Sequence, residues 1–274
     1  MSNHPTGPSR SSPHRHGLPV GRSSRRALAL TLIALVAASA PSADSATVVP
    51  PIPPAPRILI PKLTAQLTLD GELNESVWAQ AAVIPSFSRN DGTGPEREAT
   101  TLRIWYDDTA LYLGWTCRDT DIQATFTARD SKFWEEEVVE FFVTRQDLAR
   151  YYEFQWNPLG GVFDAIIDND LDAQGFSKKI TGDWSFTASG MRHAVKVRGT
   201  VSDATDRDEL WQVEVTLPFV DFAGAPPKPG EQWRGNFFRF NRGRGVSADL
   251  VSWSPTHRKG FHEPSRFGVL EFGP

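Results

Sequence analysis

The sequence contains a single cysteine, Cys117, so no disulfide can form within the chain. Cys117 ends the run Leu-Gly-Trp-Thr-Cys, which is typical of a buried strand, and we expect a core residue rather than a reactive thiol. Methionine is equally scarce, with Met191 the only one after the initiator. The six histidines include no H-x-x-x-H pair, which disfavours a zinc site.

Signatures of several enzyme classes are also missing. The chain has no P-loop, no dinucleotide-binding fingerprint and no nucleophile elbow. Glycoside hydrolysis stays open at this point. It needs only two carboxylates about 5–10 Å apart, and the chain contains 33 Asp and Glu residues.

The first 46 residues have the order of an export signal. Residues 1–26 are rich in Ser, Pro, Arg and His, and Arg25 and Arg26 precede an apolar run over 27–38. That run has about a dozen residues, fewer than the roughly 20 that a membrane span needs. We therefore expect a signal peptide over 1–46, an exported protein in the periplasm or outside the cell, and no membrane span after signal removal.

The route of export and the cleavage position are less defined. Ala38-Ser39-Ala40 is an A-x-A site, but Pro41 follows it directly and favours cleavage later, before about residue 47. Ser24-Arg25-Arg26 leaves twin-arginine export open beside the general route. No cysteine stands near the end of the apolar run, so a lipid anchor is unsupported.

The mature part is acidic and rich in tryptophan. Residues 47–274 keep 24 Lys and Arg against 32 Asp and Glu, which gives a net charge of −8. An acidic surface repels phosphate backbones, so we expect no nucleic-acid partner. All nine tryptophans lie in this part, a surplus that suits a protein which stacks on sugar rings.

Prolines divide the mature part into a linker and one domain. Residues 47–62 contain proline at a density that favours an extended polyproline segment. Residues 63–274 show no second linker and no clear repeat, so we expect a single domain.

Strand signals dominate this domain. Residues 211–217 alternate apolar and polar side chains, as a strand of an antiparallel sheet with one solvated face does. Short helices are expected only over 75–82 and 218–222. The fold class predicted is therefore all-β, an antiparallel β-sandwich with one or two short helices. The predicted strands are 65–69, 99–106, 110–118, 138–144, 151–157, 161–168, 192–201, 210–217, 233–241, 249–253 and 267–272.

Seven segments of the domain resemble one known family when taken in order. They are Leu69–Trp78, Leu102–Leu113, Phe133–Phe142, Tyr151–Gly160, Trp211–Val215, Trp253–Pro255 and Phe261–Gly268. Together they resemble the family-9 carbohydrate-binding modules and their single-domain relatives. The resemblance implies a jelly-roll-like β-sandwich that grips the end of a saccharide chain between two aromatic side chains, with calcium in a structural role.

The resemblance also implies which residues bind the sugar. The first aromatic falls on Trp134, and the second falls on Phe261, where the best-known members carry Trp. A pocket carboxylate falls on Glu140. Further polar partners fall on Gln155, where an Arg is expected, on Asn157 and on Arg258.

The residues themselves leave alternatives open. Trp134 stands beside Lys132 and three glutamates, which favours an exposed indole, although it can also cover one end of the sandwich. Phe261 fits packing as well as binding. Glu140 lies between apolar neighbours in a strand, so it faces either solvent or a polar pocket. Asn157 is a turn former or a hydroxyl partner, and His262 is a hydrogen-bonded structural residue or a ligand.

Calcium rests on the resemblance alone. Asp70 and Glu72 are the first oxygen-rich candidates for calcium ligands, and Asp119 with Asp121 is a second pair. The three glutamates from Glu135 to Glu137 are more simply explained as a solvent-exposed acidic run. None of these has the spacing of an EF-hand loop.

The sequence therefore predicts a non-catalytic, monomeric module that binds a β-glycan such as xylan or cellulose fragments and serves carbohydrate catabolism. Three alternatives remain. One is an enzyme associated with glycoside hydrolysis. The second is a haem-binding sandwich, for which Met191 is the only methionine that could serve as an axial ligand. The third is a purely structural envelope protein.

Overall fold

The computed structural model describes residues 52–145 and 147–274. The predicted signal peptide over 1–46 lies outside these residues. Strand accounts for 42% of the described residues and helix for 6%, and the strands form two sheets, so the all-β prediction is confirmed. No helix in the described part is long and apolar enough to cross a membrane.

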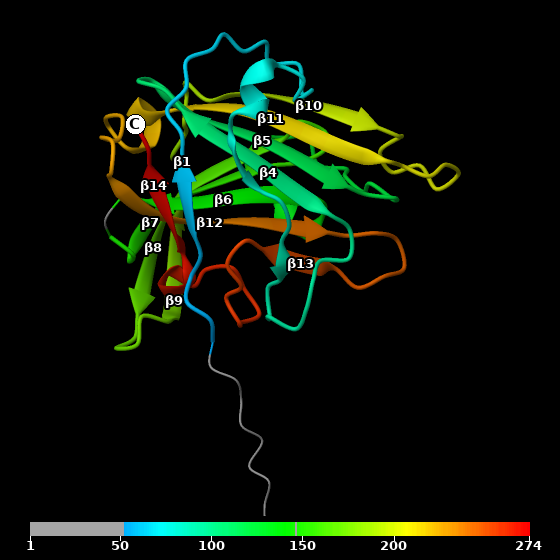
Figure 1. Ribbon diagram of the computed structural model, residues 1–274. Helices are drawn as coiled ribbons and strands as arrows, with labels where there is room; N and C mark the ends of the chain where they lie inside the picture. Colours follow the sequence, from blue (N-terminus) through cyan, green and yellow to red (C-terminus); the bar gives the residue numbers. More distant parts are fainter. Residues whose placement is uncertain (1–51, 146) are drawn as a thin grey trace, which may run out of the picture. The chain divides into compact units, whose positions relative to one another are not determined.

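The larger sheet runs in the order β1-β14-β12-β6-β7-β8-β9, with β13 and β3 joined beside β12. All its pairings are antiparallel except that of β1 with β14, which lie side by side in Figure 1. Its strands are β1 (Arg57–Ile60), β3 (Ser88–Arg89), β6 (Val138–Thr144), β7 (Arg150–Trp156), β8 (Val162–Leu171), β9 (Ser177–Asp183), β12 (Gln232–Asn241), β13 (Asp249–Ser252) and β14 (Gly268–Phe272).

The smaller sheet runs in the order β10-β11-β5-β4-β2 and is antiparallel throughout (Figure 1). Trp211, Val213 and Val215 of its strand β11 are fully buried, as their alternation predicts. Its strands are β2 (Ala82–Ile84), β4 (Thr100–Tyr106), β5 (Ala110–Arg118), β10 (Arg192–Arg198) and β11 (Leu210–Pro218).

The larger sheet is covered on both faces. Val139 and Phe141 of β6 point into the main core between the sheets. Phe142, on the opposite face of the same strand, joins a second apolar cluster on the outer side of the sheet. Because successive side chains of a strand point to opposite faces, Glu140 shares this outer face with Phe142. That outer face carries the candidate site.

Helical structure is confined to single turns. The helix predicted over 75–82 is the 3₁₀ turn η1 (Ser76–Ala79), and the one predicted over 218–222 is α1 (Phe219–Phe222). Two further 3₁₀ turns were not predicted, η2 (Phe133–Glu135) and η3 (Pro264–Arg266). The turn η2 presents Trp134 to the outer face of the larger sheet.

The prediction of the strands is wrong in five places, two of which are the short strands β2 and β3, which were not predicted. Residues 57–60 lie in the predicted linker over 47–62, but they form β1 because β14 supplies a hydrogen-bonding edge. No strand forms over 65–69. Strand β9 was missed, since its residues are exposed and polar and so carry no apolar alternation.

Cys117 is fully buried in the main core, as predicted, and burial raises the pKa of its thiol to about 12. We expect it to stay unmodified by a thiol reagent such as DTNB at pH 8 in the native protein, because the thiolate is the reactive form. In denaturant it should react at the rate of a free cysteine. Rapid modification of the native protein would contradict this burial.

Candidate functional site

A pocket of about 450 Å³ opens on the outer face of the larger sheet. Its floor comes from β6, β7, β8 and β12. One wall comes from η2 and β9, and another from the loop that contains Gly260, Phe261 and His262. The pocket brings together four of the residues that the sequence predicts for sugar binding: Trp134, Glu140, Gln155 and Phe261.

Three aromatic rings form one side of the pocket. Trp134 lies edge-to-face against Phe163 of β8, with ring centroids 5.6 Å apart, and against Trp184, 5.9 Å away. Phe163 and Trp184 meet in the same way at 5.5 Å. Edge-to-face contact fixes the planes of all three rings relative to one another. Trp134 is half-buried and Trp184 is 48% exposed, so both indoles remain accessible to a ligand.

Trp184 is the aromatic residue that the sequence analysis missed. It follows the end of β9 and folds back over that strand. A side chain at Gly182 would place its Cβ 2.4 Å from the indole Nε1, so the absence of a side chain there lets the ring pack against the strand. The sequence feature that marks Trp134, a tryptophan between polar residues, is also present at Trp184, which lies between Asp183 and Ser185.

Phe261 lines the pocket but is only 3% exposed. Its ring is stacked on Phe238 of β12 with centroids 4.2 Å apart, and it tilts against Phe240 at 4.7 Å. One face of Phe261 is thus covered by the protein. Its role as the second sugar platform stays a prediction, and Trp184 offers much more free ring surface.

The polar floor holds two buried carboxylates. Glu140 of β6 is 2% exposed and Glu153 of β7 is 4% exposed. Gln155 pairs with Glu140 across the two strands, and its Nε2 donates a hydrogen bond to Glu153 Oε1 at 2.6 Å. No described residue donates a hydrogen bond to the Glu140 carboxyl, and the Gln155 Oε1 is buried without a partner. Buried polar atoms without partners are rare, and here they face the pocket.

Burial shifts the acidity of both carboxyls. It raises the pKa of Glu140 well above its usual value, and the charge of Glu153 raises it further. It raises the pKa of Glu153 to about 7, against the hydrogen bond from Gln155. The pair therefore holds a proton near neutral pH, so the floor contains both a hydroxyl donor and free acceptor oxygens.

His262 completes the floor. Its Nδ1 is 2.8 Å from the Tyr151 hydroxyl, its Nε2 is 3.9 Å from Glu153 Oε2, and its ring stacks on Phe142. Burial lowers the pKa of His262 to about 4, so the ring is neutral beside Glu153 at physiological pH. The structural reading of this histidine, a hydrogen-bonded side chain, is the one that the structure supports.

Asn157 does not join the pocket. Its Oδ1 accepts hydrogen bonds from the backbone N–H of Gly161, at 2.7 Å, and of Leu159. Its Nδ2 donates to the carbonyl of Phe126. These bonds satisfy a fully buried amide within the turn after β7, which is the turn-forming alternative.

Arg258 also lies away from the pocket floor. Its side chain is exposed, and the guanidinium sits 4.5 Å from the ring centroid of Phe176. That cation–π contact draws the charge toward the loop after β8 and not toward Glu140. The prediction that Arg258 is a polar partner of the sugar is therefore not supported by its position.

Asp70 and Glu72, the calcium candidates, do not fit a calcium ion. Asp70 Oδ1 accepts a hydrogen bond from the backbone N–H of Glu72, which closes a local turn. The Glu72 oxygens are engaged by Lys196 and by Asn74. Among the described residues no group of three Asp, Glu, His or Cys side chains comes together, whereas calcium takes six to eight oxygen ligands. Calcium elsewhere in the chain stays a prediction.

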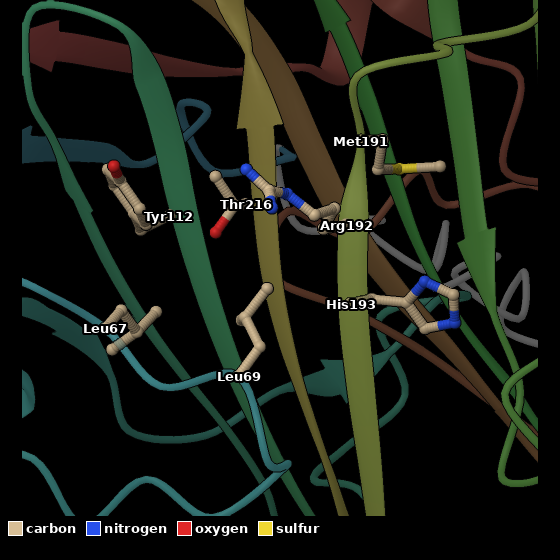
Figure 2. A pocket seen from close by; sticks show the side chains of 7 residues that line it. All are labelled: Leu67, Leu69, Tyr112, Met191, Arg192, His193 and Thr216. Atoms are coloured by element: carbon tan, nitrogen blue, oxygen red, sulfur yellow. The ribbon is translucent and has the colours of Figure 1, made fainter.

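A second groove, of about 640 Å³, lies on the outer face of the smaller sheet. Figure 2 shows Tyr112, Thr216 and Arg192 in a row across β5, β11 and β10, and these residues pair across the strands. Tyr112 is stacked on Trp105 and donates its hydroxyl hydrogen bond to Asp107. Tyr112, the only Phe, Tyr or Trp residue among those that line the groove, is thus already engaged, and this groove lacks the free indoles of the pocket on the larger sheet.

Comparison with known proteins agrees with this geometry. Residues 90–272 match carbohydrate-binding family 9. The chain belongs to this family. Family 9 consists of non-catalytic carbohydrate-binding modules, so carbohydrate binding is the function class of this chain and catalysis is not. A search of curated protein sequences finds no match.

Solved structures share the family 9 fold at low sequence identity. A proposed carbohydrate-binding protein from Bacteroides uniformis is 20% identical, with a TM-score of 0.60 over 80% of this chain and 99% of that chain. A family 9 module from Caldicellulosiruptor kristjanssonii in complex with cellotriose is 13% identical, with a TM-score of 0.53 over 79% and 93%. The same organism's module in complex with glucose is 15% identical, with a TM-score of 0.55 over 80% and 96%. These likenesses show the β-sandwich fold.

Proposed function

We propose that this family 9 protein is an exported module that holds one end of a β-glycan in the pocket on the outer face of its larger sheet. The observation that carries the proposal is the pairing of two accessible indoles, Trp134 and Trp184, with the buried polar floor of Glu140, Glu153 and Gln155. The cellotriose and glucose bound by the family 9 module of Caldicellulosiruptor kristjanssonii support a glucose-based ligand.

The two parts of the pocket match the two chemical faces of a sugar ring. The C–H groups of a pyranose form an apolar patch, and an indole that covers it removes apolar area from water. The hydroxyls at the rim of the ring need donors and acceptors. Glu140 and the free Gln155 Oε1 have unused hydrogen-bonding capacity, and their bonds are stronger when one partner is charged.

The N-terminal sequence supports an exported location for this module. The basic, apolar and small-residue order of the first 46 residues supports export. A module outside the cytoplasm that binds β-glycan fragments, xylan included, suits polysaccharide catabolism. We expect it to act as a monomer.

Alanine at Trp134 or at Trp184 should weaken binding of cellotriose or xylotriose by about 30-fold or more, since truncating a central aromatic anchor costs about 2 kcal/mol or more. Isothermal titration calorimetry on the purified protein measures the effect. The control is Val220→Ala, which truncates an exposed apolar side chain outside the pocket and should leave the affinity unchanged.

Two results would contradict the proposal. One is unchanged affinity in both tryptophan variants, which would place the ligand elsewhere. The other is release of shorter saccharides during incubation with the protein, which would show catalysis. If only the Trp134 variant lost binding, the pocket would still be the ligand site. The second aromatic side chain that contacts the sugar would then be Phe261 and not Trp184.

A further inference from the structure

The acidic pair on the pocket floor differs from the other buried carboxylates of the described chain. Asp119 and Glu137 share the guanidinium of Arg239. Glu214 accepts hydrogen bonds from the indole of Trp78 and from two backbone N–H groups. These acids have their charge compensated inside the protein, as buried charges generally require.

Glu140 has no such compensation, and Glu153 has only the hydrogen bond that it accepts from Gln155 Nε2. No described Arg or Lys forms an ion pair with either residue, and the His262 ring lies 3.9 Å from Glu153. His262 is neutral, because burial disfavours its protonated form. Glu140, almost completely buried, has no hydrogen-bond partner and lines the pocket. The pocket floor therefore holds two buried acids that no described cation neutralises, and it is open to a positive group.

We propose that the ligand of this pocket carries a protonated amino group, and that its terminal sugar is a 2-amino sugar such as glucosamine. This inference rests on the proposed function, since it assigns a chemical class to the saccharide in the same site. The ammonium group would lie between the carboxylates of Glu140 and Glu153, where charge-assisted hydrogen bonds are strongest. The aromatic wall adds to the preference, because indole faces attract cations.

The charges around the pair do not oppose this preference. Of the two basic residues of β12, Arg239 alternates with Phe238, so it points to the other side of the sheet, where it is paired with Asp119. Arg234 donates its hydrogen bonds to the carbonyls of Phe267 and Gly268.

Three half-buried charges flank the pocket: Glu136 and Glu263 accept hydrogen bonds from backbone N–H groups, and Arg242 donates to the carbonyl of Trp134. Other charged side chains of the surrounding turns and of strand β9 are exposed to solvent and screened by it. These exposed residues are Lys132, Glu135, Lys178, Lys179, Asp183, Arg258 and Lys259.

Entry of an ammonium group favours the ionised form of the pair, so binding should expel a proton. Burial holds a proton on Glu140 and raises the pKa of Glu153 to about 7. A cation stabilises the charged carboxylates and lowers their pKa values. Affinity for an amino sugar should therefore rise between pH 5.5 and pH 7.0, while affinity for a neutral sugar should not rise.

The test compares three disaccharides with the same β-1,4 linkage that differ at C2. They are the glucosamine disaccharide, cellobiose with hydroxyls, and the N-acetylated disaccharide without charge. At pH 7.0 we expect the glucosamine disaccharide to bind about tenfold more tightly than cellobiose. Calorimetry in two buffers of different ionisation enthalpy should show proton release for the glucosamine disaccharide alone.

Two isosteric variants test whether the carboxylates of the pocket floor cause the preference for the glucosamine disaccharide. Glu140→Gln and Glu153→Gln should each reduce the tenfold preference to about equal binding. The matched control is Glu135→Gln, which removes the same charge from an exposed side chain outside the pocket and should keep the preference.

Each outcome decides the inference. Equal binding of cellobiose and the glucosamine disaccharide would overturn it and leave the proposed function standing. Binding of none of the three would count against both. A preference that survives in the folded glutamine variants would also overturn it. If a variant does not fold, the proton release measured on the unaltered protein decides instead.

Discussion

Replacing Arg239 with methionine should lower the free energy of unfolding by about 3–5 kcal/mol. The guanidinium is completely buried and bonds Asp119 Oδ2 at 2.6 Å and Glu137 Oε2 at 3.4 Å. Methionine fills a similar volume but leaves two carboxylates buried without a cation. Urea denaturation at pH 7, followed by tryptophan fluorescence, measures the change.

The exposed ion pair between Arg118 and Glu209 provides the control. Arg118→Met removes the same charge and should cost less than about 1 kcal/mol, since solvent screens both partners. The cost of Arg239→Met should also shrink toward pH 5, because protonation neutralises the stranded acids. Burial already raises the pKa of Glu137 to about 8 with the arginine in place. A cost that equals that of Arg118→Met would contradict the network.

The partners of Arg239 show where sequence reasoning stops. Alternating apolar residues around it correctly predict a strand over 233–241, and a charged residue within a buried strand implies a partner. Asp119, however, lies 120 positions away. The antiparallel registers of two sheets bring the two residues together, and no local pattern encodes that contact.

The residues of the candidate site were also only partly predicted from the sequence. Trp134 and Glu140 were assigned from the family resemblance, while their immediate neighbours alone left packing or solvent exposure open. Glu153 was missed, although it alternates with Gln155 on the same face of β7 and so follows from the strand assignment. Trp184 was missed because β9 was missed, and an exposed polar edge strand lacks the periodic signal that marks buried strands.

Asn157 and Arg258, which the resemblance also suggests as sugar partners, do not line the pocket. The resemblance that suggested them conveys position in the chain but not the direction of a side chain. Asn157 turns its amide into the backbone of its own loop, and Arg258 turns toward Phe176. Both orientations depend on neighbours that family patterns leave unspecified.

The pocket floor should destabilise the fold at neutral and alkaline pH, and Glu153→Gln should remove this cost. Burial raises the pKa of Glu153 from a usual 4.5 to about 7, so the folded state binds this proton more tightly than the unfolded chain does. The stability that the folded state gains from binding this proton on Glu153 is fully present below about pH 4.5 and is lost as the pH rises through 7. The variant should therefore gain on the order of 2–3 kcal/mol at pH 8 and little at pH 4.5.

Urea denaturation of both proteins at pH 4.5, 6 and 8 tests this prediction, with Glu135→Gln as the exposed control that should change little at any of them. A stabilisation independent of pH would mean that packing, and not charge, is the cause. A gain that grows with pH would show that the unaltered protein retains a destabilising carboxylate pair. Residues that lower stability persist when a ligand needs them. Stabilisation combined with loss of saccharide affinity in one variant would thus tie the cost of this buried pair to binding.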